Sequence, residues 1–169
     1  LPVNSVKELV AHARSAPNRI NYASTGKASL AHLATELFAT TTGVQLTHVP
    51  YKGVGASLSD LLSGQVQMSL LSMGSVYSQV RAKKLKALGI ATRERHAMAP
   101  DIPTLIEAGV PGYVVTQWHG MMAPRGTPPA IVERLHAEIV KAVKRPEVAQ
   151  RFALDGTEPV ASAPKAFAA

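Results

Sequence analysis

The chain has 169 residues, of which 46% are hydrophobic and 17% charged, and it contains no cysteine. This length fits one domain, or one domain and part of another, and the hydrophobic share argues for a packed core. The lack of cysteine excludes a disulfide framework, a thiolate metal site and a cysteine nucleophile. No apolar run in the sequence approaches the roughly 20 residues that a membrane-spanning helix needs.

The formal net charge of +7 is distributed along the chain rather than gathered in one basic arm. The main groups of basic residues lie at 81–86, 93–95 and 141–151. They do not interleave with stacking aromatic residues as in proteins that bind single-stranded nucleic acid. The pattern therefore predicts no nucleic-acid partner, and a modest positive field of this kind favours organic anions.

A helix is predicted at the start of the chain. Ser5 and Glu8 form a capping box, and Pro17 marks the end of the helix. The apolar positions Val6, Leu9, Val10 and Ala13 form its buried stripe. A short strand is predicted to follow at residues 20–23.

Residues 24–29 form a polar turn of small residues between this strand and a second predicted helix. Ser29 is the expected N-cap, the helix runs to about Thr41, and Gly43 is its expected stop. The predicted apolar stripe consists of Leu30, Leu33, Leu37 and Phe38. Unpaired amides and the helix dipole make such a turn suitable for an anion. The same pattern also fits an ordinary loop that binds nothing, and the residues alone leave both interpretations open.

The following segments alternate between strands and helices. The predicted elements are a strand at 44–49, a helix carrying Leu58, Leu61 and Leu62 that ends near Gly64, a strand at 65–71, a helix at 75–82 and a largely buried strand at 85–91. This alternation predicts an α/β fold in which helices cover a parallel sheet. Gly53 and Gly55 do not form a phosphate loop, because Lys52 precedes them instead of following them.

The last third of the chain carries further capping signals. Thr104 and Glu107 form a second capping box, which opens a short helix that Gly109 ends. Residues 113–122 read as an extended apolar run. Thr127 is the expected N-cap of a long helix with Pro128 at its first position. The remaining predicted features are the stripe Ile131, Leu135, Ile139 and Val143, a helix that begins at Pro146 and ends before Gly156, and a strand at 157–160.

The motif Tyr22-x-Ser24-x-Gly26-x-x-Ser29-x-x-His32-Leu33 resembles the signature turn of the Bug-type solute-binding receptors of tripartite tricarboxylate transporters. Later segments agree with the same family in order: His-Val-Pro-Tyr-Lys-Gly at 48–53, Pro-Asp-Ile-Pro-Thr at 100–104 with Glu-Ala-Gly at 107–109, and residues 118–124. One residue of the signature turn departs from the family pattern, since Ala28 stands where the family usually has a second glycine.

The resemblance implies the second part of a receptor with a periplasmic-binding-protein-like (type II) α/β fold. Residues 1–117 correspond to the ligand-binding second lobe. Residues 118–169 correspond to the hinge crossing, near 117–119, and to the C-terminal part of the first lobe. The apolar stripe of the long helix would then lack its native cover, and we expect self-association or fraying of this part of the chain.

The resemblance also implies a function in the periplasm. The receptor would capture a carboxylate-bearing small molecule, such as a di- or tricarboxylate, an acidic amino acid or an aromatic acid. It would deliver this organic anion to the membrane subunits of the transporter. The expected ligand-binding residues are Ser24, Thr25, Gly26, Ala28, Ser29, His32, Tyr51, Lys52 and Ser72. For Tyr51 and Lys52 the alternative is a purely structural turn.

The residues give no support for catalysis, a metal or a cofactor. The six histidines show no zinc-binding spacing, and no Gly-x-Ser-x-Gly elbow or paired carboxylates occur. The pattern favours His32 packing or bonding within the first turn of its helix, and His48 fits either the core or a cleft wall. A ligand-sensing domain of a transcription regulator and a small α/β enzyme stay open as alternatives to the receptor.

Overall fold

The computed structural model describes residues 1–154 and 157–168. The chain forms two compact units, Leu1–Gln117 and Trp118–Ala169. The division falls within the segment where the sequence analysis places a hinge. No helix in the described part of the chain is long and apolar enough to cross a membrane.

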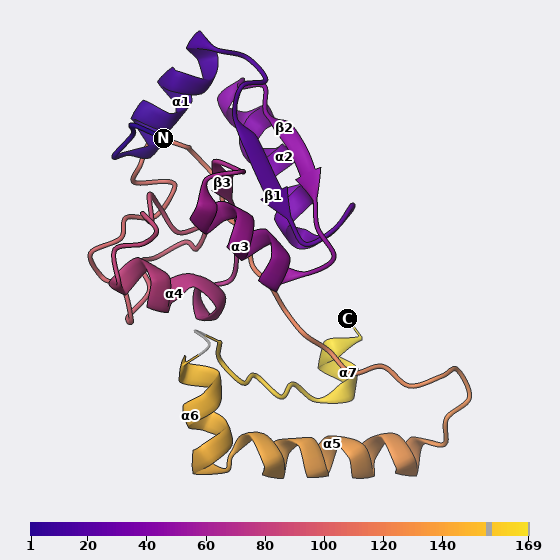
Figure 1. Ribbon diagram of the computed structural model, residues 1–169. Coiled ribbons are helices and arrows are strands. Elements are labelled where there is room, and N and C mark those ends of the chain that lie inside the picture. The colour runs from indigo at the N-terminus through magenta and orange to yellow at the C-terminus, as the bar shows by residue number, and fades with distance from the viewer. Residues whose placement is uncertain (155–156, 169) are drawn as a thin grey trace. The chain divides into compact units, whose positions relative to one another are not determined.

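The first unit is an α/β unit built on a small parallel sheet. Among the described residues, β1 (Asn21–Ser24), β2 (Thr47–Pro50) and β3 (Met68–Ser69) form one sheet in the order β2-β1-β3. Figure 1 shows α2 (Leu30–Thr42) behind the strands and α3 (Val54–Ser63) in front of them. The connection from β1 to β2 and the connection from β2 to β3 run in opposite directions across the sheet, and right-handed crossovers in opposite directions place their helices on opposite faces. The prediction of a parallel sheet flanked by helices is confirmed.

Two further helices belong to this unit, α1 (Val6–Ser15) and α4 (Met73–Arg81). At the start of α1, the Glu8 amide donates to Ser5 Oγ at 3.1 Å, as the capping box predicts. The Glu8 carboxylate accepts instead from the amide of Asn4, at 2.7 Å. The predicted N-terminal helix is therefore confirmed, with one cap bond shifted by a residue.

Helix α2 buries a different stripe from the predicted one. Leu30, Leu33 and Leu37 are 41%, 56% and 47% exposed, so of the predicted residues only Phe38 lies in the core. The buried face consists of Ala31, Ala34, Thr35, Phe38, Ala39 and Thr42, which also follow helical spacing. Small side chains allow the helix axis to lie close to the sheet. The buried Thr35 hydroxyl is satisfied because it donates to the Ala31 carbonyl at 2.7 Å.

The core of the first unit lies between α1, α2 and the later loops. The ring of Phe38 packs edge-on against Tyr113 with centroids 6.1 Å apart. The Tyr113 hydroxyl donates to the Ala34 carbonyl at 2.6 Å, so a residue far along the chain fixes the middle of α2. Other buried members of this cluster are Val3, Val6, Leu9, Ala13, Ile20, Ala39, Val44, Leu105 and Val110.

The predicted strands are longer than the observed ones. The strand predicted at 44–49 is observed as Thr47–Pro50, and the one at 65–71 as Met68–Ser69. The strand predicted at 85–91 is wrong: its residues are at most half-buried, and Ile90 makes one isolated bridge to Thr104. A strand needs a partner along its whole length, and here the backbone of Ile90 bonds only to Pro103 and Leu105.

Two helical predictions in the first unit also need correction. In α3 the buried side chain is Ser57, while Leu58 and Leu61 are half-buried and Leu62 is exposed. Residues 104–109 form turns and no helix, although both bonds of the capping box are present. Gly109, with φ 95°, ends the segment after a single turn.

The second unit contains α5 (Pro129–Val143), α6 (Pro146–Leu154) and α7 (Pro164–Phe167). Pro128 is the N-cap of α5 and Pro129 its first residue, so the prediction of Thr127 and Pro128 for these positions is wrong by one residue. The Thr127 hydroxyl donates to the Pro124 carbonyl at 2.8 Å instead of capping the helix.

No strand forms at 157–160, contrary to the prediction, because the described residues of this unit offer no partner strand. The described part of α6 extends to Leu154, and the end predicted for this helix, before Gly156, lies outside the described residues. Trp118 packs edge-on against Phe167, with centroids 5.7 Å apart. On α5, Ile131 and Leu135 are 50% and 45% exposed, so this stripe is only partly covered within the unit.

Alkaline pH is expected to destabilise the first unit through Tyr113. Burial raises the pKa of the Tyr113 hydroxyl to about 12. The folded state holds this proton more tightly than the unfolded state. The resulting contribution to the free energy of unfolding is fully present below pH 10 and is lost as the pH rises through 12. Between pH 8.5 and pH 11, the free energy of unfolding measured in urea should decrease by about 1 kcal/mol more in wild type than in Tyr113→Phe. Equal losses in both proteins would contradict this role of Tyr113.

Candidate functional site

The carboxyl ends of the three parallel strands meet at one edge of the sheet. Ser24 pairs with Pro50, and Ala23 pairs with Ser69, so the strands end side by side. Each strand leads into the N-terminus of a helix, namely α2, α3 and α4. Helix N-termini present unpaired amides and a partial positive charge, and ligands of open α/β sheets bind at this edge. The edge is therefore the candidate site.

The turn after β1 is organised by the buried side chain of Ser24. Its hydroxyl lies 2.9 Å from the Gly26 carbonyl, to which it donates, and accepts from the Gly26 amide at 3.2 Å. The Nε2 atom of His48, on the neighbouring strand, lies 2.7 Å from the same oxygen. Ser24 thus shapes the turn from inside and has its hydrogen-bonding capacity used within the protein.

The next residues of the turn bond to the first turn of α2. Ser29 is the N-cap, as predicted, and its hydroxyl accepts from the amide of His32 at 3.3 Å. The Ala28 amide donates to Nδ1 of His32 at 3.0 Å, and the Ser29 amide donates to the Gly26 carbonyl at 3.2 Å. The backbone amides of Gly26, Ala28 and Ser29, three of the expected ligand-binding residues, therefore all have partners inside the protein. A carboxylate would have to replace them.

Leu30 and Ala31, the first two residues of α2, were not among the expected ligand-binding residues. These positions precede the first intrahelical hydrogen bond, so a helix leaves their amides without a helical partner. The N-cap assignment of Ser29 was the signal that could have identified them. Thr25 and Ser29, two of the expected ligand-binding residues, belong to the turn that leads directly into these positions.

The backbone of the turn is held in an unusual conformation. Ala28 has φ 60°, a left-handed conformation that glycine adopts more readily than alanine. This is the position at which the sequence departs from the family glycine. A Cβ atom at Gly26 would lie 3.8 Å from the Tyr51 carbonyl, so the loop after β2 passes next to the turn.

The structure places the other predicted site residues along the same edge. The Tyr51 amide donates to the Ser24 carbonyl at 3.0 Å, and its hydroxyl donates to Asp60 Oδ2 at 2.7 Å. This hydroxyl therefore holds α3 in place, and the bond to Asp60 raises the pKa of Tyr51. Lys52 is exposed. Ser72 is the N-cap residue of α4, and its hydroxyl lies 2.7 Å from Ser75 Oγ.

The rings of Tyr22, His48 and His32 form one stack, so His48 lies between β1 and the first turn of α2. The His48 ring lies between Tyr22 and His32, with centroid distances of 4.9 Å and 4.0 Å. The Tyr22 hydroxyl donates to Glu36, and His32 Nε2 lies 4.0 Å from the same carboxylate. Burial lowers the pKa of His48, the charges of His32 and Lys27 lower it further, and Glu36 opposes them.

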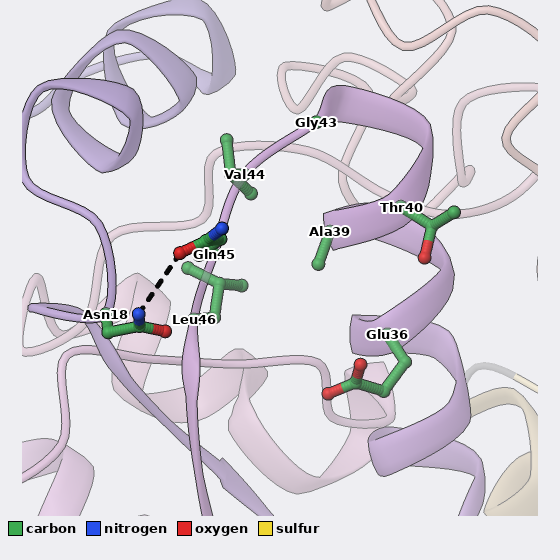
Figure 2. Close-up of a pocket in the computed structure, with 8 residues that line it drawn as sticks. All are labelled: Asn18, Glu36, Ala39, Thr40, Gly43, Val44, Gln45 and Leu46. Atoms are coloured by element: carbon green, nitrogen blue, oxygen red, sulfur yellow. Dashed lines mark hydrogen bonds between the residues drawn. The ribbon is translucent and has the colours of Figure 1, made fainter.

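One surface hollow of the described residues lies away from this edge of the sheet. An open hollow of about 470 Å³ lies between the C-terminal half of α2 and the segment that leads into β2. Figure 2 shows the residues that line it. Its wall includes Asn18 and Gln45, which are joined by a 3.1 Å hydrogen bond at the amino ends of the strands. No predicted ligand-binding residue lines it. Within residues 1–154 and 157–168, no group of three or more His, Asp or Glu residues could hold a metal ion.

A parallel sheet with helix N-termini along its carboxyl edge defines the first unit as an open α/β fold. The family model described as the tripartite tricarboxylate transporter family receptor matches residues 1–168. The chain therefore belongs to this family of solute-binding receptors, and its relatives include Bug-type proteins. The resemblance inferred from the signature turn is confirmed.

Several known proteins are similar to this chain. BugT of Bordetella pertussis is 36% identical over 97% of the chain and 50% of its own length. A protein of Pseudomonas sp. (strain P51) is 40% identical over 96% of the chain and 49% of its own length. The chain thus spans about half the length of these relatives.

Solved structures show the same fold. An R. palustris protein determined with adipate has a TM-score of 0.91 and 35% identity, over 99% of this chain and 56% of its own. MatC from Rhodopseudomonas palustris, with bound malate, has a TM-score of 0.86 and 34% identity, over 92% of this chain and 53% of its own. The periplasmic binding protein BugD has a TM-score of 0.86 and 31% identity, over 95% of this chain and 54% of its own. The protein therefore has a periplasmic-binding-protein fold.

Proposed function

We propose that this chain acts as part of a periplasmic receptor that captures a carboxylate-bearing small molecule for a tripartite tricarboxylate transporter. The observation that carries the proposal is the convergence of three helix N-termini, including the signature turn, at one edge of the parallel sheet. Such an edge suits an anion. Related structures that hold adipate and malate support a dicarboxylate as ligand.

In this proposal one ligand carboxylate lies against the turn 24–29. The hydroxyls of Thr25 and Ser29 and the first amides of α2 donate to it, and the Ala28 amide joins them once it leaves His32. Ser24 acts through the shape of the turn, since its hydroxyl is buried and bonded to Gly26 and His48. Tyr51, Lys52 and Ser72 border the site from the neighbouring loops.

The proposal extends to the organisation of the receptor. Residues 1–117 form the ligand-binding lobe, and 118–169 contribute the hinge crossing and part of the other lobe. The membrane subunits of the transporter are the partners that receive the ligand. The half-exposed stripe of α5, with Ile131 and Leu135, is where we expect this chain to associate with itself.

Calorimetry with adipate and its uncharged dimethyl ester tests the ligand class. A hydrogen bond to a charged group contributes about 1.5–3 kcal/mol, so the loss of charge should weaken binding at least about tenfold. Malate and a simple monocarboxylate of the same length complete the series. Equal affinity for adipate and the ester would show that the site does not recognise a carboxylate, and the proposed function would then be wrong.

A further inference from the structure

The hydrogen bond between the Ala28 amide and His32 restricts where His32 carries its protons. The amide donates to Nδ1 at 3.0 Å, so Nδ1 must be unprotonated. In the neutral ring the proton then sits on Nε2, which faces the Glu36 carboxylate at 4.0 Å. A second proton can bind only at Nδ1. Protonation of His32 and its bond with Ala28 therefore exclude each other.

The stack of the Tyr22, His48 and His32 rings can take up only one proton, because its neighbouring groups disfavour a second positive charge. His48 lies 4.0 Å away, ring to ring, and two imidazolium charges at that distance repel. Burial also disfavours the charged form of His48, whose Nε2 atom is engaged with Ser24. Glu36 on α2 attracts a charge on the stack, Lys27 in the turn opposes it, and the Tyr22 hydroxyl is bonded to Glu36.

We propose that His32 is a proton-operated latch on the anion-binding turn, so that capture of a carboxylate is coupled to uptake of one proton. In the closed state the His32 ring is neutral and its Nδ1 atom accepts the hydrogen bond from the Ala28 amide. When His32 accepts a proton at Nδ1, that bond breaks, the amide becomes free, and a positive charge lies beside it. A carboxylate then takes the place of Nδ1 as acceptor. His32 and His48 act as positioning residues, and the inference rests on the proposed function of this turn.

The coupling fixes the direction of the pH dependence. A bound carboxylate favours the protonated latch, so by linkage the affinity for the anion increases as the pH falls. For one proton the dissociation constant decreases at most about tenfold per pH unit. Adipate is a suitable probe between pH 6.5 and 8.0, because carboxylic acids remain ionised throughout this range.

The latch itself can be tested without a ligand. Ring-nitrogen NMR of the 169-residue chain should show His32 as the Nε2–H tautomer at pH 8.5. The amide signal of Ala28 should shift during acidification with the same midpoint as the His32 ring. An Nδ1–H tautomer, or an Ala28 signal that stays constant while His32 titrates, would overturn the proposal.

Calorimetry with adipate then tests the coupling. Wild type should bind at least about threefold more tightly at pH 6.5 than at pH 8.0, with proton uptake revealed by two buffers of different ionisation enthalpy. His32→Asn retains an acceptor near the position of Nδ1 but does not titrate, so its affinity should be constant across this range. His12→Asn, which removes an imidazole from α1, should keep the wild-type pH dependence.

The outcomes separate the latch from the proposed function. Adipate binding that is equally strong at both pH values, or a pH dependence that persists in His32→Asn, would overturn the latch while leaving carboxylate capture intact. Absence of adipate binding at every pH would contradict the proposed ligand class. In that case the NMR titration still decides whether protonation of His32 releases Ala28.

Discussion

Ser29→Asp is expected to abolish carboxylate binding while the first unit stays folded. Ser29 caps α2 through its hydroxyl, which accepts from the His32 amide at 3.3 Å. Aspartate is an equally good N-cap, and its charge interacts favourably with the helix dipole. The same charge repels an incoming carboxylate. At about 4 Å with an effective dielectric constant of 20, the repulsion is about 4 kcal/mol, or roughly a thousandfold in affinity.

Ser29→Asn is the matched control, because asparagine caps a helix without adding charge. Its affinity for adipate should stay within about tenfold of wild type, which corresponds to the loss of one hydroxyl contact. Circular dichroism and urea unfolding of both variants separate binding from folding. If Ser29→Asp binds adipate as well as wild type, the ligand lies elsewhere and the assignment of the turn is wrong.

Local chemistry explains why the sequence predicts the signature turn well. The cap at Ser29 and the helix stop at Gly43 depend on neighbouring backbone atoms, and both are confirmed. The partners of the turn are a different matter. His48 reaches Ser24 because β1 and β2 pair in parallel, with Tyr22 opposite His48. That register depends on how the strands assemble, and no spacing within the motif indicates it.

Burial on α2 shows a second limit of reading a sequence alone. The helix carries two stripes of helical spacing, one of leucines and one of mostly small residues that includes Ala31, Ala34 and Thr35. Hydrophobicity favours the leucines, but the sheet and Tyr113 contact the stripe of small residues. What packs opposite a helix decides which face is buried. The length of a strand likewise depends on the neighbouring strands with which it pairs. The strand predicted at 85–91 does not form because Ile90 makes only one isolated bridge, to Thr104.

Phe38→Ala and Leu37→Ala test this assignment of the two faces directly. Phe38 is 3% exposed and contacts the ring of Tyr113, whereas its neighbour Leu37 is 47% exposed. Truncating a buried phenylalanine removes its transfer free energy and leaves a cavity, at a cost of about 3–5 kcal/mol. An exposed leucine should cost within about 0.5 kcal/mol. Because domains have only about 5–15 kcal/mol of stability, Phe38→Ala should remove a large share of the free energy of unfolding of the first unit.

Urea unfolding of the two variants and wild type measures both changes in the free energy of unfolding. A large decrease in the free energy of unfolding of Phe38→Ala alone is the expected result. A large cost for Leu37→Ala would mean that the leucine face of α2 is covered in solution. A small cost for Phe38→Ala would mean that the contact with Tyr113 does not hold α2 against the core. Because α2 begins at Ser29, loss of this packing should also weaken adipate binding, even though Phe38 lies more than two helical turns from the anion-binding turn.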